Sequence, residues 1–134
     1  KPNGVFYVSA SGAHVVESSA FTRVTEPVSL ATQSGPMLVI DGALHPRFLP
    51  DGDSLYIRNG VGVAPDGQSA FLAISDAPVN FHDFAVFFRD GLGARDALFL
   101  DGSISRLYAP ALGRDERRRA RRRGQTRPPL PARR

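Results

Sequence analysis

Cysteine is absent from this sequence of 134 residues. The chain therefore has no disulfide bond, no thiolate metal site and no cysteine nucleophile. Long apolar runs are absent too, because the longest uncharged ones are short stretches such as residues 37–40 and 85–88. A membrane-spanning helix needs roughly 18 apolar residues. We therefore expect no membrane span.

Motifs for several common reactions are also missing. The sequence contains no P-loop, no dinucleotide-binding glycine fingerprint after a strand, no H-E-x-x-H and no G-x-S-x-G. The three histidines, His14, His45 and His82, are far apart and lack the spacing of metal ligands. We expect neither a bound metal nor a cofactor.

The net charge of +4 is unevenly distributed. Residues 114–134 hold ten arginines against two carboxylates, which leaves seven basic and eleven acidic side chains in the first 113 residues. The folded part is thus mildly acidic, which removes the main support for a basic nucleic-acid-binding fold. Residues 113–134 contain one large apolar residue, Leu130, so we expect a disordered Arg/Pro-rich tail after a domain over residues 1–112. The tail either binds polyanions weakly by counterion release or has no selected role.

Short β-prone runs separated by turn residues dominate the domain. Asp41-Gly42 is a strong signal for a tight hairpin turn, and Pro65-Asp66-Gly67 separates two further apolar runs. Strands are predicted over residues 5–8, 14–16, 37–40, 61–64, 70–75 and 97–100.

Two helices are also predicted. Asn80 is a good N-cap with Asp83 three residues later, and a phenylalanine stripe continues at helical spacing to a stop at Gly91 or Gly93. The stripe indicates a helix packed on a sheet rather than a ligand platform. A shorter helix is expected from Pro27 to residues 34–35. Together these elements predict an α+β domain with a mixed β-sheet, β-hairpins and about two packed helices.

Small polar residues flank several of the expected buried strands, where loops commonly carry function. Gln33-Ser34-Gly35 precedes the 37–40 strand, Arg58-Asn59 follows a short strand over 55–57, and Asp101-Gly102-Ser103 follows the 97–100 strand. Each group alone is typical of an ordinary turn. Together they predict a site that pairs a carboxylate with an arginine, which suits a phosphorylated or polyhydroxylated substrate.

Four sequence strings in a fixed order carry a resemblance to a known family. They are ATQSGPMLVIDG at 31–42, IRNGVG at 57–62, VNF at 79–81 and ALFLDG at 97–102. Over about residues 1–110 the chain resembles the phosphodiester glycosidases, which include the uncovering enzyme that removes N-acetylglucosamine from phosphate on lysosomal-enzyme glycans. The likeness is closest to a bacterial branch of secreted or periplasmic proteins, which implies that location for this chain.

The resemblance implies hydrolysis of the bond between a sugar's anomeric carbon and a phosphodiester. An ordinary glycoside hydrolase protonates a poor leaving group, but a phosphate monoester is a weak base, so protonation matters less here. Arg58 is expected to bind the phosphate as a bidentate ligand. Asp101 is expected to be the catalytic carboxylate, with Asp41 as the runner-up, although a hairpin turn favours a structural role for Asp41. The other expected substrate-binding residues are Gln33, Ser34, Gly35, Asn59, Gly102 and Ser103.

Two departures from the family pattern bear on activity. Members carry an upstream Asn-Gly-Gly or Asn-Ala-Gly motif for which Asn3-Gly4 is a poor substitute, and the loop after Leu100 lacks the glycine run of the uncovering enzyme. We therefore expect the domain to be incomplete at its N-terminal side. A non-catalytic carbohydrate or cell-envelope binding module, or an inactive fragment of the hydrolase, remains the alternative.

Overall fold

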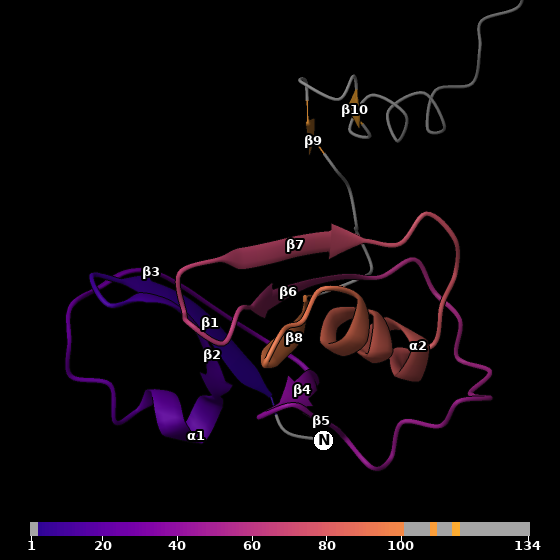
Figure 1. The fold of residues 1–134 in the computed structure, drawn as a ribbon, viewed down its shortest axis with the longest axis horizontal. Coiled ribbons are helices and arrows are strands. Elements are labelled where there is room, and N and C mark those ends of the chain that lie inside the picture. The colour runs from indigo at the N-terminus through magenta and orange to yellow at the C-terminus, as the bar shows by residue number, and fades with distance from the viewer. Residues whose placement is uncertain (1–2, 101–107, 110–113, 116–134) are drawn as a thin grey trace, which may run out of the picture.

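The computed structural model describes residues 3–100, 108–109 and 114–115. Its first half is a three-stranded antiparallel sheet in the order β2-β1-β3 (Figure 1). The strands are β1 (Gly4–Ser9), β2 (Gly12–Glu17) and β3 (Val28–Ser34), and the single-turn helix α1 (Ser18–Phe21) follows β2.

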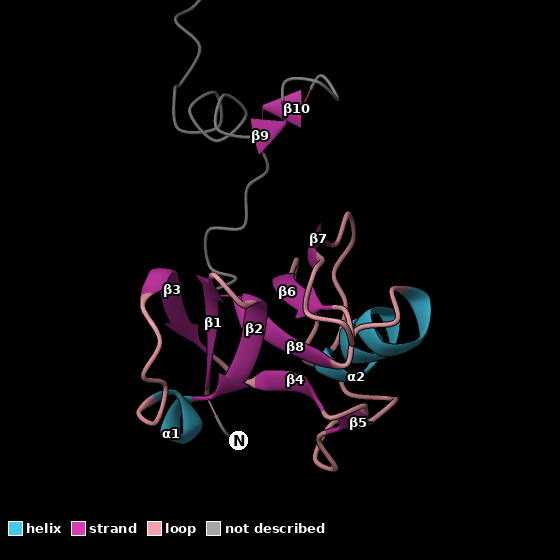
Figure 2. Ribbon diagram, turned by 60° about the vertical axis from the view of Figure 1, so that its left-hand side comes forward, coloured by secondary structure: helices cyan, strands magenta, loops and turns pink. Residues whose placement is uncertain are grey.

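A five-stranded antiparallel sheet in the order β5-β4-β8-β6-β7 forms the second half (Figure 2). Its strands are β4 (Met37–Ile40), β5 (Ala43–Leu44), β6 (Asn59–Val63), β7 (Ala70–Ile74) and β8 (Asp96–Leu100). The helix α2 (Phe81–Val86) continues into a π-helical turn, η1 (Phe87–Gly91), before β8. A separate two-residue pair joins β9 (Tyr108–Ala109) to β10 (Arg114–Asp115).

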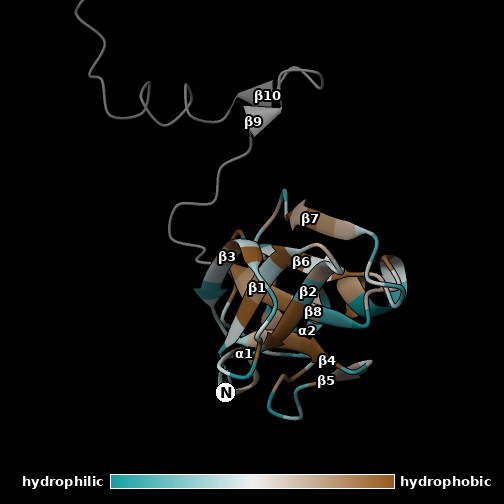
Figure 3. Ribbon diagram, turned by 90° about the vertical axis from the view of Figure 1, so that its left-hand side faces the viewer, coloured by the Kyte–Doolittle hydropathy of each residue, from teal (hydrophilic) through white to brown (hydrophobic). Residues whose placement is uncertain are grey.

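The five-stranded sheet is covered on both faces, so the described residues form three layers. Neighbouring residues of β8 show this, because Ala97 packs with the α2 phenylalanines whereas Leu98 packs with Ala13 and Val15 of the other sheet. Hydrophobic residues accordingly concentrate on the strands and on α2, and the loops are largely hydrophilic (Figure 3).

Two glycines of β6 make room for α2 and η1. A Cβ on Gly62 would lie 2.7 Å from Cδ1 of Phe88, and one on Gly60 would lie 3.2 Å from Cε1 of Phe84. Phe88 is fully buried at 0% exposure. Burial of such a side chain stabilises the fold by about 2 to 3 kcal/mol. Glycine at these positions therefore lets the helix sit directly on the sheet.

The predicted α+β class with hairpins is confirmed, and the described residues include two α-helices, α1 and α2. All strand pairings in the described ranges are antiparallel. The Asp41-Gly42 hairpin turn has positive φ at both residues, 49° and 80°, as a type I′ turn requires. Asn80 caps α2 as predicted, since its side chain accepts a 2.8 Å hydrogen bond from Asp83 N.

The helix predicted from Pro27 to residues 34–35 is wrong, because this segment is strand β3. Residues 29–33 are exposed, so a helix there would have no apolar face to bury, and short helices without packing are marginal in water. The edge of β1 instead offers backbone partners along the segment, from Leu30 opposite Val8 to Ser34 opposite Gly4.

The predicted tail over residues 113–134 lies outside the described residues, apart from Arg114–Asp115 in β10. The boundary at residue 112 and the disorder of the tail therefore stay predictions. Within the described ranges no helix is long and apolar enough to cross a membrane.

Candidate active site

The antiparallel topology places the starts of two strands and the end of a third at the same end of the five-stranded sheet. Strands β4 and β6 both run antiparallel to β8, which lies between them. The starts of β4 and β6 therefore lie beside the end of β8. Phe99 N donates to Pro36 O at 3.1 Å on one side, and Leu100 pairs with Asn59 on the other. Leu100, the last residue of β8, thus lies beside the Arg58-Asn59 segment.

Arg58 lies at the centre of this sheet end, and it is buried with 3% exposure. Its Nε donates to Val79 O at 2.8 Å and its Nη2 donates to Ser54 O at 2.7 Å. Its own backbone is held as well, because Arg58 N donates to the Ser75 hydroxyl at 2.9 Å. Two sides of the guanidinium are thus fixed by backbone carbonyls, and among the described residues no hydrogen bond involves Nη1.

Aromatic rings surround the Arg58 guanidinium. Its Cζ lies 3.7 Å from the ring centroid of Phe81, and the centroids of Tyr56 and Phe99 are 5.3 and 5.6 Å away. A guanidinium over an aromatic face gains about 0.5 to 2 kcal/mol, depending on how far it is desolvated. The rings therefore restrict the orientation of the guanidinium and shield it from water.

The electrostatics of Arg58 favour an anion. Burial lowers the pKa of the guanidinium, and the neighbouring Tyr56 partly opposes that shift. In the described part of the chain, no carboxylate lies within ion-pair distance of Arg58. Burial of a cation is costly unless an anion pairs with it, so a negatively charged group beside this guanidinium would be stabilised.

The structure puts the other predicted site residues in different surroundings, and no contact of Gln33, Ser34 or Gly35 with Arg58 is seen among the described residues. Asn59 is half-buried at the start of β6. Gly35 is closely approached by Asn3, whose side chain a Cβ at Gly35 would overlap. Gln33 is exposed, and its amide donates to the Ser18 hydroxyl at 3.0 Å, toward α1. Ser34 ends β3 and pairs in register with Gly4. Asp101, Gly102 and Ser103 lie outside the described residues.

The runner-up carboxylate is at the wrong end of the sheet. Asp41 follows the last residue of β4, whereas the Arg58 end of the sheet lies at the start of that strand. Its carboxylate accepts from Arg95, with Oδ1 and Nη2 2.7 Å apart. The structure therefore gives Asp41 the turn position expected from the Asp-Gly pair and separates it from Arg58.

The histidines do not meet one another. His14 Nε2 lies 2.8 Å from the Ser11 hydroxyl on the hairpin of the first sheet, and His82 Nδ1 lies 3.1 Å from Asp83 at the start of α2. His45 Nδ1 accepts from Arg47 N at 3.1 Å. No group of three or more His, Asp or Glu side chains within the described ranges has the geometry of a metal site.

A small hollow of about 160 Å³ adjoins the Arg58 environment. Two of its lining residues, Ser54 and Phe81, also contact the Arg58 guanidinium. Asn80 lines it as well, and its amide donates to the carbonyls of Pro50 and Gly52, both at 3.2 Å. Sequence reasoning missed Ser54 because its contribution is a backbone carbonyl, which any residue type would provide.

Comparison with known proteins identifies the family of the chain. The phosphodiester glycosidase family model matches residues 1–128, past the predicted domain boundary at 112. "Uncharacterized protein YigE" of Escherichia coli K12 is 41% identical over 108 residues, which is 81% of this chain and 42% of that relative. The chain thus spans less than half the length of that protein. Because the match runs over most of its length, the chain belongs to the phosphodiester glycosidase family.

Proposed function

We propose that the chain forms part of a hydrolase that cleaves the bond between a sugar's anomeric carbon and a phosphodiester. Membership of the family supports a hydrolase in general terms. The observation that carries the finer proposal is the buried guanidinium of Arg58 at the sheet end where β4 and β6 start and β8 ends. A phosphodiester is the kind of anion that this cation would bind.

The phosphate would be held by the Nη1–Nη2 edge of Arg58. Nε and one Nη2 hydrogen are engaged by Val79 O and Ser54 O, so the fork cannot turn away from the ligand. The planar guanidinium can donate hydrogen bonds to two phosphate oxygens at once. The Ser34 hydroxyl and the Gly35 amide, at the end of β3 and just before β4, would supply further hydrogen bonds to the same group.

Asp101 would act on the sugar side of the bond. As the C1–O bond breaks, the bridging oxygen and the bonding electron pair leave with the phosphate monoester. The OH of a water molecule joins C1, and the remaining proton passes to the Asp101 carboxylate or to solvent. A carboxylate beside C1 would stabilise the positive charge that develops there. Gln33, Asn59, Gly102 and Ser103 would orient the sugar hydroxyls.

A binding module that retains the pocket without the chemistry is the alternative. Asp101→Asn separates the two, since a hydrolase with this variant loses turnover and keeps its ligand, whereas a binding module has no turnover to lose.

We place the protein in the periplasm or outside the cell on the family resemblance, and we propose that the Arg-rich segment adds weak polyanion binding. Deleting residues 114–134 and measuring polyanion affinity against salt concentration tests the second point.

The assay offers a sugar-1-phosphodiester to the chain and measures free sugar. Asp101→Asn is expected to lower kcat by about 10²- to 10³-fold, the scale found when one electrostatic group at the reacting centre is removed. Asp90→Asn is the matched control, because Asp90 lies in η1 and is ion-paired with Arg89 away from the site. Equal turnover by Asp101→Asn and the wild-type chain would remove Asp101 from the mechanism.

A further inference from the structure

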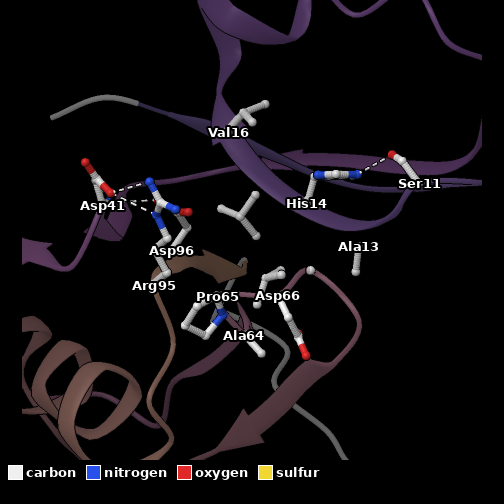
Figure 4. A pocket seen from close by; sticks show the side chains of 13 residues that line it. Ser11, Ala13, His14, Val16, Asp41, Ala64, Pro65, Asp66, Arg95 and Asp96 are labelled. Atoms are coloured by element: carbon white, nitrogen blue, oxygen red, sulfur yellow. Dashed lines mark hydrogen bonds and ion pairs between the residues drawn. The ribbon is translucent and has the colours of Figure 1, made fainter.

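A cleft of about 310 Å³ lies at the other end of the five-stranded sheet from Arg58 (Figure 4). Asp96, which lines the cleft, begins β8, and Leu100, beside the Arg58 segment, ends it. At about 3.3 Å per residue, roughly 13 Å of strand separates the two places. The cleft is therefore a different site from the one proposed for the phosphodiester.

The walls of the cleft are fixed to one another. Ala13 N of β2 donates to Gly67 O of the β6–β7 turn at 2.9 Å, which joins the two sheets across the cleft. Asp41 N donates to the Asp96 carboxylate at 2.9 Å, which ties the end of β4 to the start of β8. Binding sites for small molecules are usually formed in advance in this way, so little ordering is needed on binding.

The cleft has an apolar floor between two polar sides. Val15 and Val63, each 5% exposed, supply part of the floor. Figure 4 shows Arg95 with Asp41 on one side and His14 with Ser11 on the other. A flat, partly apolar ring would rest on the valines, with polar substituents reaching both sides.

The polar groups of the cleft match hydroxyl groups better than charged ligands. Arg95 can only donate hydrogen bonds, Asp41 and Asp96 accept them, and His14 does either according to its tautomer. A hydroxyl both donates and accepts, so a ring carrying several hydroxyls pairs with all of these groups. Three carboxylates, Asp66 included, against one arginine disfavour an anion.

We propose that this cleft binds a neutral saccharide of one or two rings. The size fits, because about 310 Å³ is at the lower end of the volumes of small-molecule sites. The proposal does not depend on hydrolysis at the Arg58 end, since it concerns an unphosphorylated sugar and other residues. A chain that holds a glycan here keeps a sugar polymer close to its surface whether or not it cleaves a phosphodiester.

Amide chemical shifts in ¹⁵N NMR spectra of the full chain test the proposal, with D-glucose and maltose as probes and glycerol and putrescine as comparisons. We expect saturable shifts of the Gly67 and Asp96 amides with the sugars and none with glycerol. Arg95→Gln should raise the sugar Kd about tenfold, because a hydrogen bond from a charged donor is lost. Arg89→Gln is the matched control, since Arg89 also forms an exposed pair with an aspartate but lies outside the cleft.

The fold should survive both substitutions, because exposed ion pairs contribute little to stability. The dispersion of the same spectra checks this. Maltose carries no phosphodiester, so a failure of the proposed hydrolysis would leave this result intact. Three outcomes would overturn the proposal: no saturable shift with either sugar, saturable shifts with putrescine but not with the sugars, or wild-type affinity in Arg95→Gln.

Discussion

Replacing Arg58 with lysine keeps the positive charge of this residue and removes its planar guanidinium. The wild-type guanidinium makes hydrogen bonds of 2.8 and 2.7 Å to Val79 O and Ser54 O and lies 3.7 Å from the Phe81 centroid. An ammonium can keep one of those bonds and loses the planar stacking. The lost charged bond is worth about 1.5 to 3 kcal/mol, and the lost stacking about 1 kcal/mol. We expect the free energy of unfolding to fall by about 2 to 4 kcal/mol.

Urea unfolding with and without inorganic phosphate measures both roles of Arg58. At a phosphate concentration ten times its Kd, the wild-type chain should gain about 1.4 kcal/mol. Arg58→Lys should gain less, because the ammonium cannot hold two phosphate oxygens at once. Arg89→Lys is the control, since its pair with Asp90 is exposed to solvent and contributes little to stability.

Two results would refute this reasoning. If Arg58→Lys unfolds at the same urea concentration as the wild-type chain, the contacts of the guanidinium do not stabilise the fold. If phosphate stabilises both chains equally, the anion binds elsewhere, and Arg58 is a structural residue only.

Other predictions concern the packing and the pH dependence. Gly62→Ala should lower the free energy of unfolding by about 1 to 3 kcal/mol, because the added Cβ would lie 2.7 Å from the buried Phe88 ring; unchanged thermal unfolding would show that α2 can shift. Asn80→Ala should cost about 2 to 3 kcal/mol in chemical unfolding, because it removes both the helix cap and the bonds to two loop carbonyls; a loss below about 0.5 kcal/mol would contradict this. The hydrogen bond from Ser11 lowers the pKa of Glu26, so its stabilisation is present above the unfolded-state pKa and is lost as pH falls through the lower folded-state pKa. Glu26→Gln should therefore flatten this acid-side decline in an unfolding series from neutral to acidic pH, and an unaltered profile would refute the assignment.

Local patterns predicted most of the strands and the main helix. The run of residues 37–40 has no polar member, which fits a strand buried by layers on both faces, and the Asp41-Gly42 pair set the hairpin that follows. The Asn80 cap also depends on neighbours in sequence alone. The β3 segment was mispredicted because its structure depends on β1, about twenty to thirty residues earlier in the chain, and not on its own pattern.

The candidate site was only partly predictable for the same reason. Arg58 followed by Asn-Gly is typical of an exposed turn, so nothing local indicates that its side chain is buried. The burial comes from Phe81 and the Val79 carbonyl, about twenty residues later, which fold over the guanidinium. The cleft beside Asp96 lacks a local signal too, because its walls come from both sheets.

Hydrolysis of a sugar-1-phosphodiester in ¹⁸O-labelled water tests the central claim most directly. Cleavage of the C1–O bond places the labelled oxygen on the sugar and leaves the phosphate monoester unlabelled. We predict an unlabelled phosphate monoester from the wild-type chain and turnover at least about 100-fold lower in Arg58→Lys. Label in the phosphate would mean attack at phosphorus and would contradict the proposed glycosidase chemistry.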